Sequence, residues 1–122
     1  GDNIYLLVEV IDDAASDSDD VQLTLTGENF GFDSRRVHIN NKGVTKVEWY
    51  NGGWESIPGR ISGKVLKDPY VGYIAEIAIP RAELGVKGGK LLFNAAFHKS
   101  SGAGCSISDS ETTEDWVYIK GL

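Results

Sequence analysis

The sequence has no methionine, one cysteine, three prolines and two histidines among its 122 residues. Because Cys105 is alone, no disulfide can form within the chain. No CxxC pair or other zinc-ligand spacing surrounds it either. Without methionine we do not expect a complete natural translation product. Gly1 fits either a cloning remnant or the end of a piece excised from a longer protein.

Long apolar runs and a positive net charge are also lacking. No apolar run approaches the roughly 20 residues of a membrane helix, and no basic segment followed by an apolar core marks a signal peptide. The formal net charge is -6. That charge argues against nucleic acid, whose phosphates require a basic face, and equally against anionic membranes. We expect neither partner. If the chain is secreted or displayed on a cell surface, its signal lies outside this fragment.

Short segments of alternating apolar and polar residues, which are typical of strands, fill the chain. The clearest runs from Gly72 to Pro80, where the proline ends the strand because it has no N–H to donate. One helical turn is expected after it, and Gly85 would end that turn. Strands are expected at 4–10, 21–26, 36–40, 45–50, 54–57, 61–66, 72–80, 90–99 and 116–120.

Turn residues separate these strands. Asn41-Lys42-Gly43 and Asn51-Gly52-Gly53 predict tight turns, and residues 100–115 read as a long polar loop. Eight or nine short strands with almost no helix predict an all-β fold, an antiparallel β-sandwich of the jelly-roll or immunoglobulin-like kind. No linker divides the sequence, so residues 1–122 are expected to form a single domain.

Four stretches carry a family resemblance: NIYLLVEVIDD (3–13), DDVQLTLT (19–26), GYIAEIAIPRAELGV (72–86) and KLLFNAAFHK (90–99). Their order and spacing resemble those of the family 9 carbohydrate-binding modules, within the wider DOMON-like β-sandwiches. The resemblance covers nearly all of the chain. It implies a non-catalytic sugar-binding β-sandwich. Members of the family carry an initial strand before the first motif, so the chain resembles a fragment in which that strand is truncated or supplied by another segment.

The resemblance also assigns binding residues. Gln22 falls where the family has a ligand-binding glutamate, and Arg36 falls at its ligand-binding arginine. The two stacking tryptophans of the family are lost, because Ser16 and the aromatic-free segment SISDSETTED occupy their places. The usual recognition of sugar ends is therefore not expected to carry over unchanged.

Sugars present C–H faces that stack on aromatic rings and hydroxyls that need polar partners. Alternation places a polar set on the outer side of three strands: Gln22, Thr24, Arg36, His38, Asn94 and His98. Ala78 and Ala96 are expected to leave space among them. The candidate stacking residues are Trp49, Tyr50 and Trp54, around the second tight turn. The alternative for Trp49 is that it enters the core beside Val47, and Trp54 is either a platform or part of the hairpin packing. Trp116 is expected in the core, and the alternative for both histidines is an ordinary hydrogen-bonded role.

An acidic segment gathers hard oxygen ligands of the kind that calcium prefers. Its members are Asp12, Asp13, Asp17, Asp19 and Asp20. Their spacing is not that of an EF-hand, but the resemblance implies structural calcium near loops. The alternative is a solvated acidic loop.

Catalysis has little support. A glycosidase needs two carboxylates across a cleft, and Glu76, set in mid-strand between apolar neighbours, is the candidate buried acid. No nucleophile elbow is present. We therefore predict no enzyme activity. The leading hypothesis is a carbohydrate-binding module of a secreted bacterial glycan-active or cell-surface protein, attached to other domains such as a glycoside hydrolase. The alternative is a structural spacer or protein-interaction domain without a sugar site.

Overall fold

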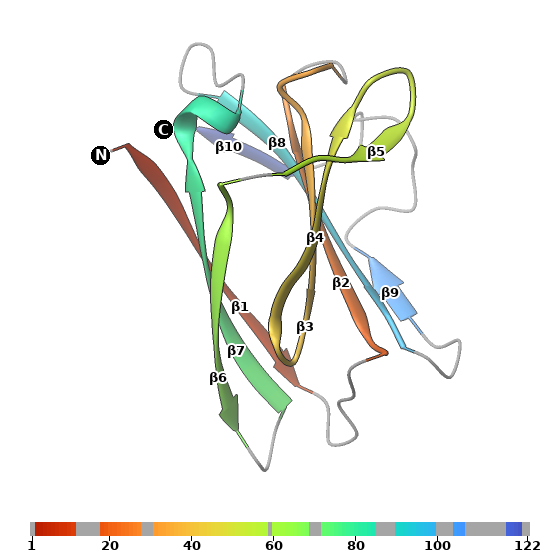
Figure 1. The fold of residues 1–122 in the computed structure, drawn as a ribbon. Helices are drawn as coiled ribbons and strands as arrows, with labels where there is room; N and C mark the ends of the chain where they lie inside the picture. The colour runs from red at the N-terminus through yellow and green to blue at the C-terminus, as the bar shows by residue number, and fades with distance from the viewer. Residues whose placement is uncertain are drawn as a thin grey trace.

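The computed structural model describes residues 2–11, 18–27, 31–58, 60–68, 72–84, 90–99, 104–106 and 117–120, and for residues 11, 66–68, 90, 105–106 and 117–120 it describes the backbone alone. Ten strands in these ranges form two antiparallel sheets that face each other as a β-sandwich (Figure 1). This confirms the predicted fold class. Within the same ranges, no helix is long and apolar enough to cross a membrane.

The described elements follow one another in chain order. They are β1 (Asn3–Ile11), β2 (Asp20–Thr26), β3 (Arg35–Asn40), β4 (Gly43–Tyr50), β5 (Trp54–Ser56), β6 (Ser62–Asp68), β7 (Gly72–Pro80), the 3-10 turn η1 (Arg81–Glu83), β8 (Lys90–His98), β9 (Gly104–Ser106) and β10 (Val117–Lys120). All nine predicted strands are present, and the predicted helical turn after Pro80 is η1. Gly85, which was expected to end it, lies outside the described residues.

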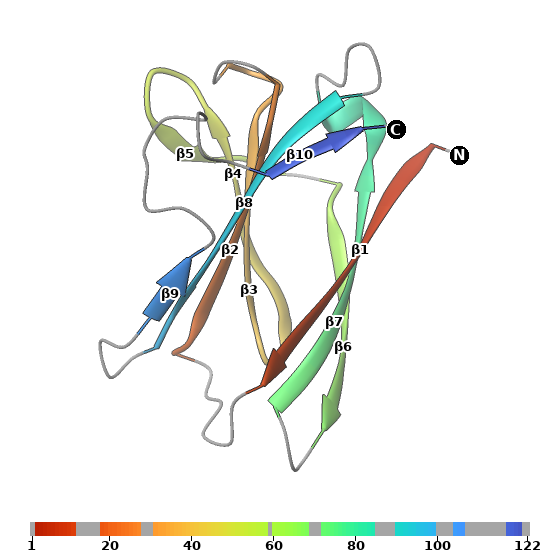
Figure 2. The same ribbon diagram turned by 180° about the vertical axis from the view of Figure 1, so that it is seen from behind.

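The smaller sheet has the order β1-β7-β6, with the strand predicted most clearly, β7, in its centre. The larger sheet has seven strands in the order β10-β8-β2-β3-β4-β5, with β9 also paired to β8. Seen from behind, β10 and β9 lie at opposite ends of one edge of β8, because β2 occupies the other edge (Figure 2). Every strand pair is antiparallel, so residues that stand opposite each other share a face of the sheet.

The core lies between the sheets and is made by every second residue of the central strands. Its fully buried members are Leu23, Leu25, Val37, Ile39, Tyr73, Ala75, Ile77, Ile79 and Leu91. Burying side chains of this kind contributes roughly 1.5–3 kcal/mol each. The alternation that predicted the strands therefore also predicted which side of each strand faces inward. Trp116, expected in the core, lies outside the described residues.

Strand β9 was not predicted, because its residues fall in the expected polar loop 100–115. Serine and glycine have low strand propensity, so the segment carries no alternating signal. The backbone nevertheless pairs with β8 from His98 to Ala96. A Cβ at Gly104 would lie 2.6 Å from the carbonyl oxygen of Phe97, so only glycine permits this close approach.

Both predicted tight turns are confirmed. Gly43 adopts a φ of 126° and Gly52 a φ of 73°, values in the region that favours glycine. The second turn joins β4 to β5 and places Tyr50 opposite Trp54 across the hairpin. This turn therefore brings together two of the predicted aromatic residues.

A buried ion pair links the two sheets at one end of the sandwich. The Nε of Arg35, the first residue of β3, donates to Oε2 of Glu83 in η1 at 3.1 Å. The two side chains are only 10% and 11% exposed. The other carboxylate oxygen of Glu83 accepts a bond from Nε of Arg60 at 3.2 Å. Because β3 belongs to the larger sheet and η1 continues the smaller one, this pair joins the two layers.

Candidate functional site

The outer face of the larger sheet carries the predicted polar set. Strand pairing places Gln22 opposite His38 and Thr24 opposite Arg36, so these side chains leave the same face of β2 and β3. Strand β8 adds two further predicted residues to that face, Asn94 opposite Thr24 and His98 opposite Asp20. Sequence alternation therefore placed these residues correctly relative to the core.

A chain of polar contacts crosses this face around His38. Oδ2 of Asp20 accepts a bond from Nε2 of Gln22 at 2.7 Å, and Oδ1 of Asp20 lies 3.1 Å from Nδ1 of His38. The other ring nitrogen of His38 contacts Oε1 of Glu48. The His38 ring thus bridges two carboxylates, one on β2 and one on β4. The side chains of His38 and Glu48 are 10% and 12% exposed, which suits a supporting role beneath the surface.

Three side chains form an aromatic corner at one end of the same face. The ring centroids of Tyr50 and Trp54 lie 5.3 Å apart with the rings edge to face. The guanidinium carbon of Arg36 lies 4.3 Å from the centroid of the Trp54 ring, within the range of a cation–π contact. Nε of Arg36 also donates to Oγ1 of Thr24 at 3.1 Å. These contacts hold an indole ring and a guanidinium in a defined arrangement at the surface.

Trp49 does not join this corner. It stands opposite Arg35 across β3 and β4, and therefore faces the core side of the sheet. Its ring lies 5.2 Å from that of Phe32, and it is half-buried. Trp49 is therefore on the same side of β4 as Val47, as the alternative interpretation had it, but it is not among the buried core residues.

The acidic segment is described only in part. Asp12, Asp13 and Asp17 lie outside the described residues. Asp19 is 4% exposed, and the carboxylate of Asp20 is engaged by Gln22 and His38. The part of the chain that the structure describes contains no group of three or more His, Cys, Asp or Glu residues able to hold a metal. A calcium site here would therefore depend on the three undescribed aspartates.

Glu76, the candidate buried acid, is exposed, and the prediction was wrong. Strand β7 alternates, and Glu76 takes the outer side of the smaller sheet, opposite Leu7 on β1 and Lys64 on β6. Its apolar sequence neighbours Ala75 and Ile77 point the other way, into the core. Ala78 lies on that outer face too, and so not among the polar set of the larger sheet.

Sequence reasoning missed two partners of the site, Glu48 and the role of Asp20. Asp20 had been grouped with the metal candidates because it lies in a run of aspartates. Glu48 stands opposite Arg36 in the register of β3 and β4. Regular pairing from the turn at Gly43 would have set Glu48 opposite Arg35, on the core side. The register shift between His38 and Ile39 brings it to the outer face instead, so the turn gave no signal for this residue.

The fold is similar to that of a family 9 carbohydrate-binding module from Caldicellulosiruptor kristjanssonii, solved in complex with glucose. The match has 18% sequence identity and a TM-score of 0.57, and it covers 97% of this chain and 70% of that chain. The chain has the fold of a family 9 carbohydrate-binding module. No protein-family model matches the sequence, and no curated protein matches it.

The family 9 fold confirms the architecture that the four sequence motifs implied. At 18% identity the likeness shows the fold alone, so the ligand must be argued from the residues themselves. The wider DOMON-like assignment stays a prediction. Gln22 and Arg36 lie on one face of adjacent strands, and their assignment as ligand-binding residues stays a prediction.

Proposed function

We propose that the protein is a non-catalytic carbohydrate-binding module whose sugar site is the outer face of the larger sheet. The family 9 fold supports the class of ligand. The main observation in favour of this site is the cation–π contact between the Arg36 guanidinium and the Trp54 ring, beside Tyr50. This corner offers an apolar ring and charged hydrogen-bond donors side by side, which is what the two chemistries of a sugar require.

Each residue of the site has a distinct role in this proposal. Trp54 supplies the surface on which a sugar ring stacks, and Arg36 donates to the hydroxyls of that ring. Gln22, Asn94 and His98 extend the polar contacts along β2 and β8 for further sugar units. His38 does not touch the sugar. It holds Asp20 and Glu48 in place beneath the face, as its burial indicates.

Affinity electrophoresis in gels containing soluble glucans, xylans and mannans tests this site. We expect Trp54→Ala to weaken binding about tenfold or more, because a buried aromatic anchor commonly contributes at least 1–2 kcal/mol. Arg36→Ala should weaken it by a similar factor, since it removes both the donors and the cation over the ring. Glu55→Ala is the matched control, because Glu55 adjoins Trp54 in β5 but is exposed on the opposite face.

Two outcomes would contradict the site. One is a wild-type chain that none of the polysaccharides retards, and the other is migration of both variants like the wild type. Circular dichroism shows whether each variant is still folded, so that loss of the binding site can be told from loss of the fold. The rival function, a structural spacer or interaction domain, predicts no retardation in any gel.

The biological setting follows from the same proposal. We infer that the module belongs to a secreted bacterial glycan-active or cell-surface protein and keeps an attached domain, such as a glycoside hydrolase, near its polysaccharide. Its acidic composition supports this setting, because a net charge of -6 disfavours nucleic acid and anionic membranes. Expression of the whole parent protein with and without this module, followed by assay on insoluble polysaccharide, tests the accessory role.

A further inference from the structure

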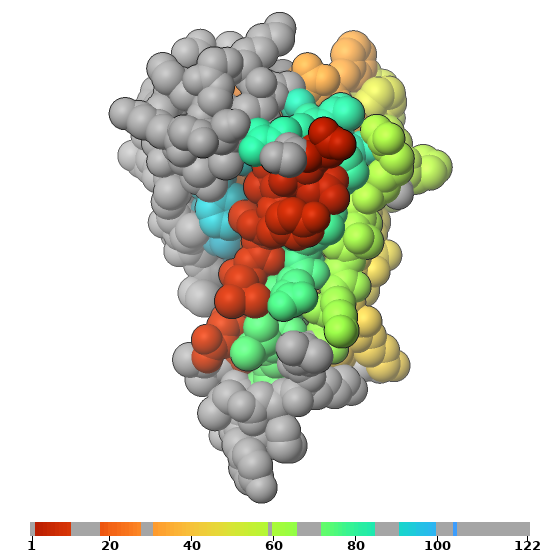
Figure 3. Space-filling view, turned by 90° about the vertical axis from the view of Figure 1, so that its left-hand side faces the viewer, coloured from red at the N-terminus to blue at the C-terminus, as the bar shows by residue number. Residues whose placement is uncertain are grey.

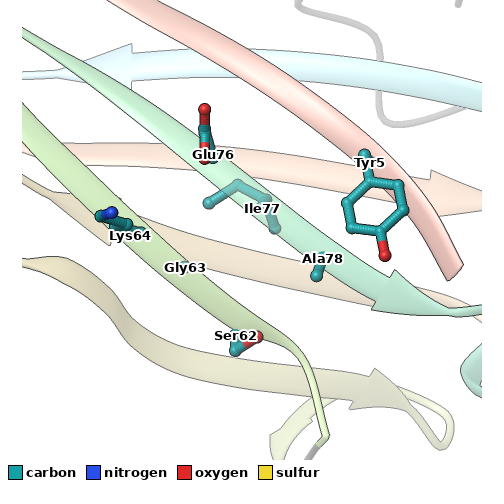
Figure 4. Close-up of a pocket in the computed structure, with 7 residues that line it drawn as sticks. All are labelled: Tyr5, Ser62, Gly63, Lys64, Glu76, Ile77 and Ala78. Atoms are coloured by element: carbon teal, nitrogen blue, oxygen red, sulfur yellow. The ribbon is translucent and has the colours of Figure 1, made fainter.

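The outer face of the smaller sheet contains a groove that the proposed function does not use. Strands β1, β7 and β6 lie side by side across this face (Figure 3). The groove has a volume of about 220 Å³ and is lined by Tyr5, Ser62, Gly63, Lys64, Glu76, Ile77 and Ala78. Tyr5 stands on one side and Ser62 and Lys64 on the other, with Ala78 between them (Figure 4). All three strands thus contribute to it.

The floor of the groove is low because its residues are small. Ala78 stands opposite both Tyr5 and Ser62 in the strand register, so a single methyl group separates these two side chains. Gly63 adds bare backbone. A Cβ at Gly63 would come within 2.8 Å of Cγ2 of Val44 on the core side, so packing between the sheets favours glycine here. The small floor leaves the Tyr5 ring standing free at its side.

Tyr5 presents an open aromatic surface beside the groove. The residue is 75% exposed, and its hydroxyl accepts a bond from Nδ2 of Asn3 at 3.3 Å. That bond joins the hydroxyl to the neighbouring side chain on the same face of β1. An exposed ring beside a shallow groove is suited to stacking against a flat apolar ligand surface.

The polar groups around the groove have unused hydrogen-bonding capacity. Lys64 and Glu76 are exposed and face each other across β6 and β7. Neither they nor Ser62 makes a side-chain bond to another described residue. The outer face of the larger sheet differs in this respect, because there Asp20, His38 and Glu48 bond to one another. The groove therefore offers an ammonium, a carboxylate and a hydroxyl to a ligand.

We propose that this groove is a second carbohydrate subsite, which takes one neutral pyranose ring of a polysaccharide. The ring stacks its C–H face on Tyr5 while Lys64 and Glu76 bond to its hydroxyls. One positive and one negative side chain offset each other, so the groove selects neither an anion nor a cation. Its volume is below the roughly 300–1,000 Å³ of sites that enclose drug-sized ligands, which suits a single ring of a longer chain.

The two sites lie on opposite faces of the sandwich, since one belongs to the outer side of each sheet. A module with two such sites can bind two polysaccharide chains at once, and the linkage between the two sites raises the overall affinity. The proposal rests on the proposed function for the class of ligand, whereas the geometry of the groove is independent of the site at Trp54.

Titration of the isotope-labelled chain with glucose, cellobiose, xylobiose and mannobiose, followed by NMR, tests the groove. We expect the backbone amides of Tyr5, Gly63 and Ala78 to shift with at least one of these sugars. Tyr5→Ala should weaken the binding that these amides report by about tenfold or more. Tyr5→Phe should retain it to within about threefold, because the ring remains.

Leu7→Ala is the matched control. Leu7 is 70% exposed on the same face of β1, two residues from Tyr5, yet it does not line the groove. Its replacement should leave the titration unchanged. The indole N–H of Trp54 reports the other site in the same spectra, so failure of the proposed function and failure of the groove are distinguishable. Absence of groove shifts with all four sugars, or persistence of full binding in Tyr5→Ala, would overturn the second subsite.

Discussion

Glu83 accepts hydrogen bonds from two arginines that differ greatly in burial. Burial alone raises the pKa of the Glu83 carboxyl, but the hydrogen bonds from Arg35 and Arg60, together with their positive charges, outweigh it and leave the pKa below its ordinary value. The folded chain therefore binds this proton less readily than the unfolded chain. The stabilisation is present above the ordinary range of a glutamate and is lost as pH falls through the lower, folded pKa.

We predict a corresponding pH dependence of stability. The free energy of unfolding should fall as pH decreases below roughly 4.3, the ordinary pKa of glutamate. Glu83→Gln should make that fall shallower, because the replaced side chain no longer titrates. Urea unfolding at several pH values between neutral and acidic measures the slope. Glu76→Gln, at an exposed glutamate outside this ion-pair cluster, is the control. Equal slopes in the wild type and Glu83→Gln would refute the argument.

The two arginines should also differ in their contribution to stability at neutral pH. Arg35→Met removes one partner of a buried pair and should cost about 3 kcal/mol. Arg60→Met should cost less than about 1 kcal/mol, because the Arg60 side chain is 70% exposed and solvent screens its pairing. Chemical unfolding of both variants measures the difference. Similar losses of unfolding free energy in the two variants would show that side-chain burial does not determine how much each arginine stabilises the fold.

At the scale of the element, β6 depends on a glycine for its close approach to the larger sheet. A Cβ at Gly63 would lie 2.8 Å from Cγ2 of Val44 and 2.9 Å from Cδ1 of Ile77. Alanine at this position would suit a strand better than glycine by about 0.5–1 kcal/mol. Overpacking against the stiff side chain of Val44 costs about 1–3 kcal/mol, so we expect this cost to exceed the gain from the better strand former.

We therefore predict that Gly63→Ala lowers the free energy of unfolding by about 1 kcal/mol. Gly53→Ala is the matched control, because nothing lies within 4 Å of the added Cβ and its φ is not among the positive values. Thermal unfolding should show a lowered midpoint for the first variant and little change for the second. A stabilised Gly63→Ala would mean that the side chains of Val44 and Ile77 move aside easily.

Strand β7 and strand β9 show why some elements are predictable and others are not. Nine residues of β7 alternate with a proline at the end, so local sequence is sufficient to define the strand. Three residues of β9, glycine, cysteine and serine, have no such pattern. Their strand conformation comes from hydrogen bonds to β8, a partner supplied by the fold.

At the scale of the whole molecule, calcium remains a prediction that concerns overall stability. An ion that binds only the folded chain must raise the midpoint temperature of unfolding. We expect a midpoint at least a few degrees higher in calcium than in chelator, and Asp13→Asn with Asp17→Asn should remove the difference. Asp20→Asn is unsuitable because Asp20 already holds His38. An identical midpoint in calcium and chelator would exclude the site.

The sequence by itself determined nine of the ten described strands, the two tight turns and the side of each predicted strand that faces the core. A period of two residues is a local property of the backbone, and the glycines at 43 and 52 are local requirements of positive φ. It therefore placed Gln22, Arg36, His38, Asn94 and His98 on outer surfaces. Tertiary structure alone decided which of two outer surfaces each residue joins, because strand order follows from packing between distant segments. Only that order separates Ala78 and Glu76 from the polar face, seats Arg36 on Trp54, and brings Tyr5 and Lys64 to the two sides of one groove.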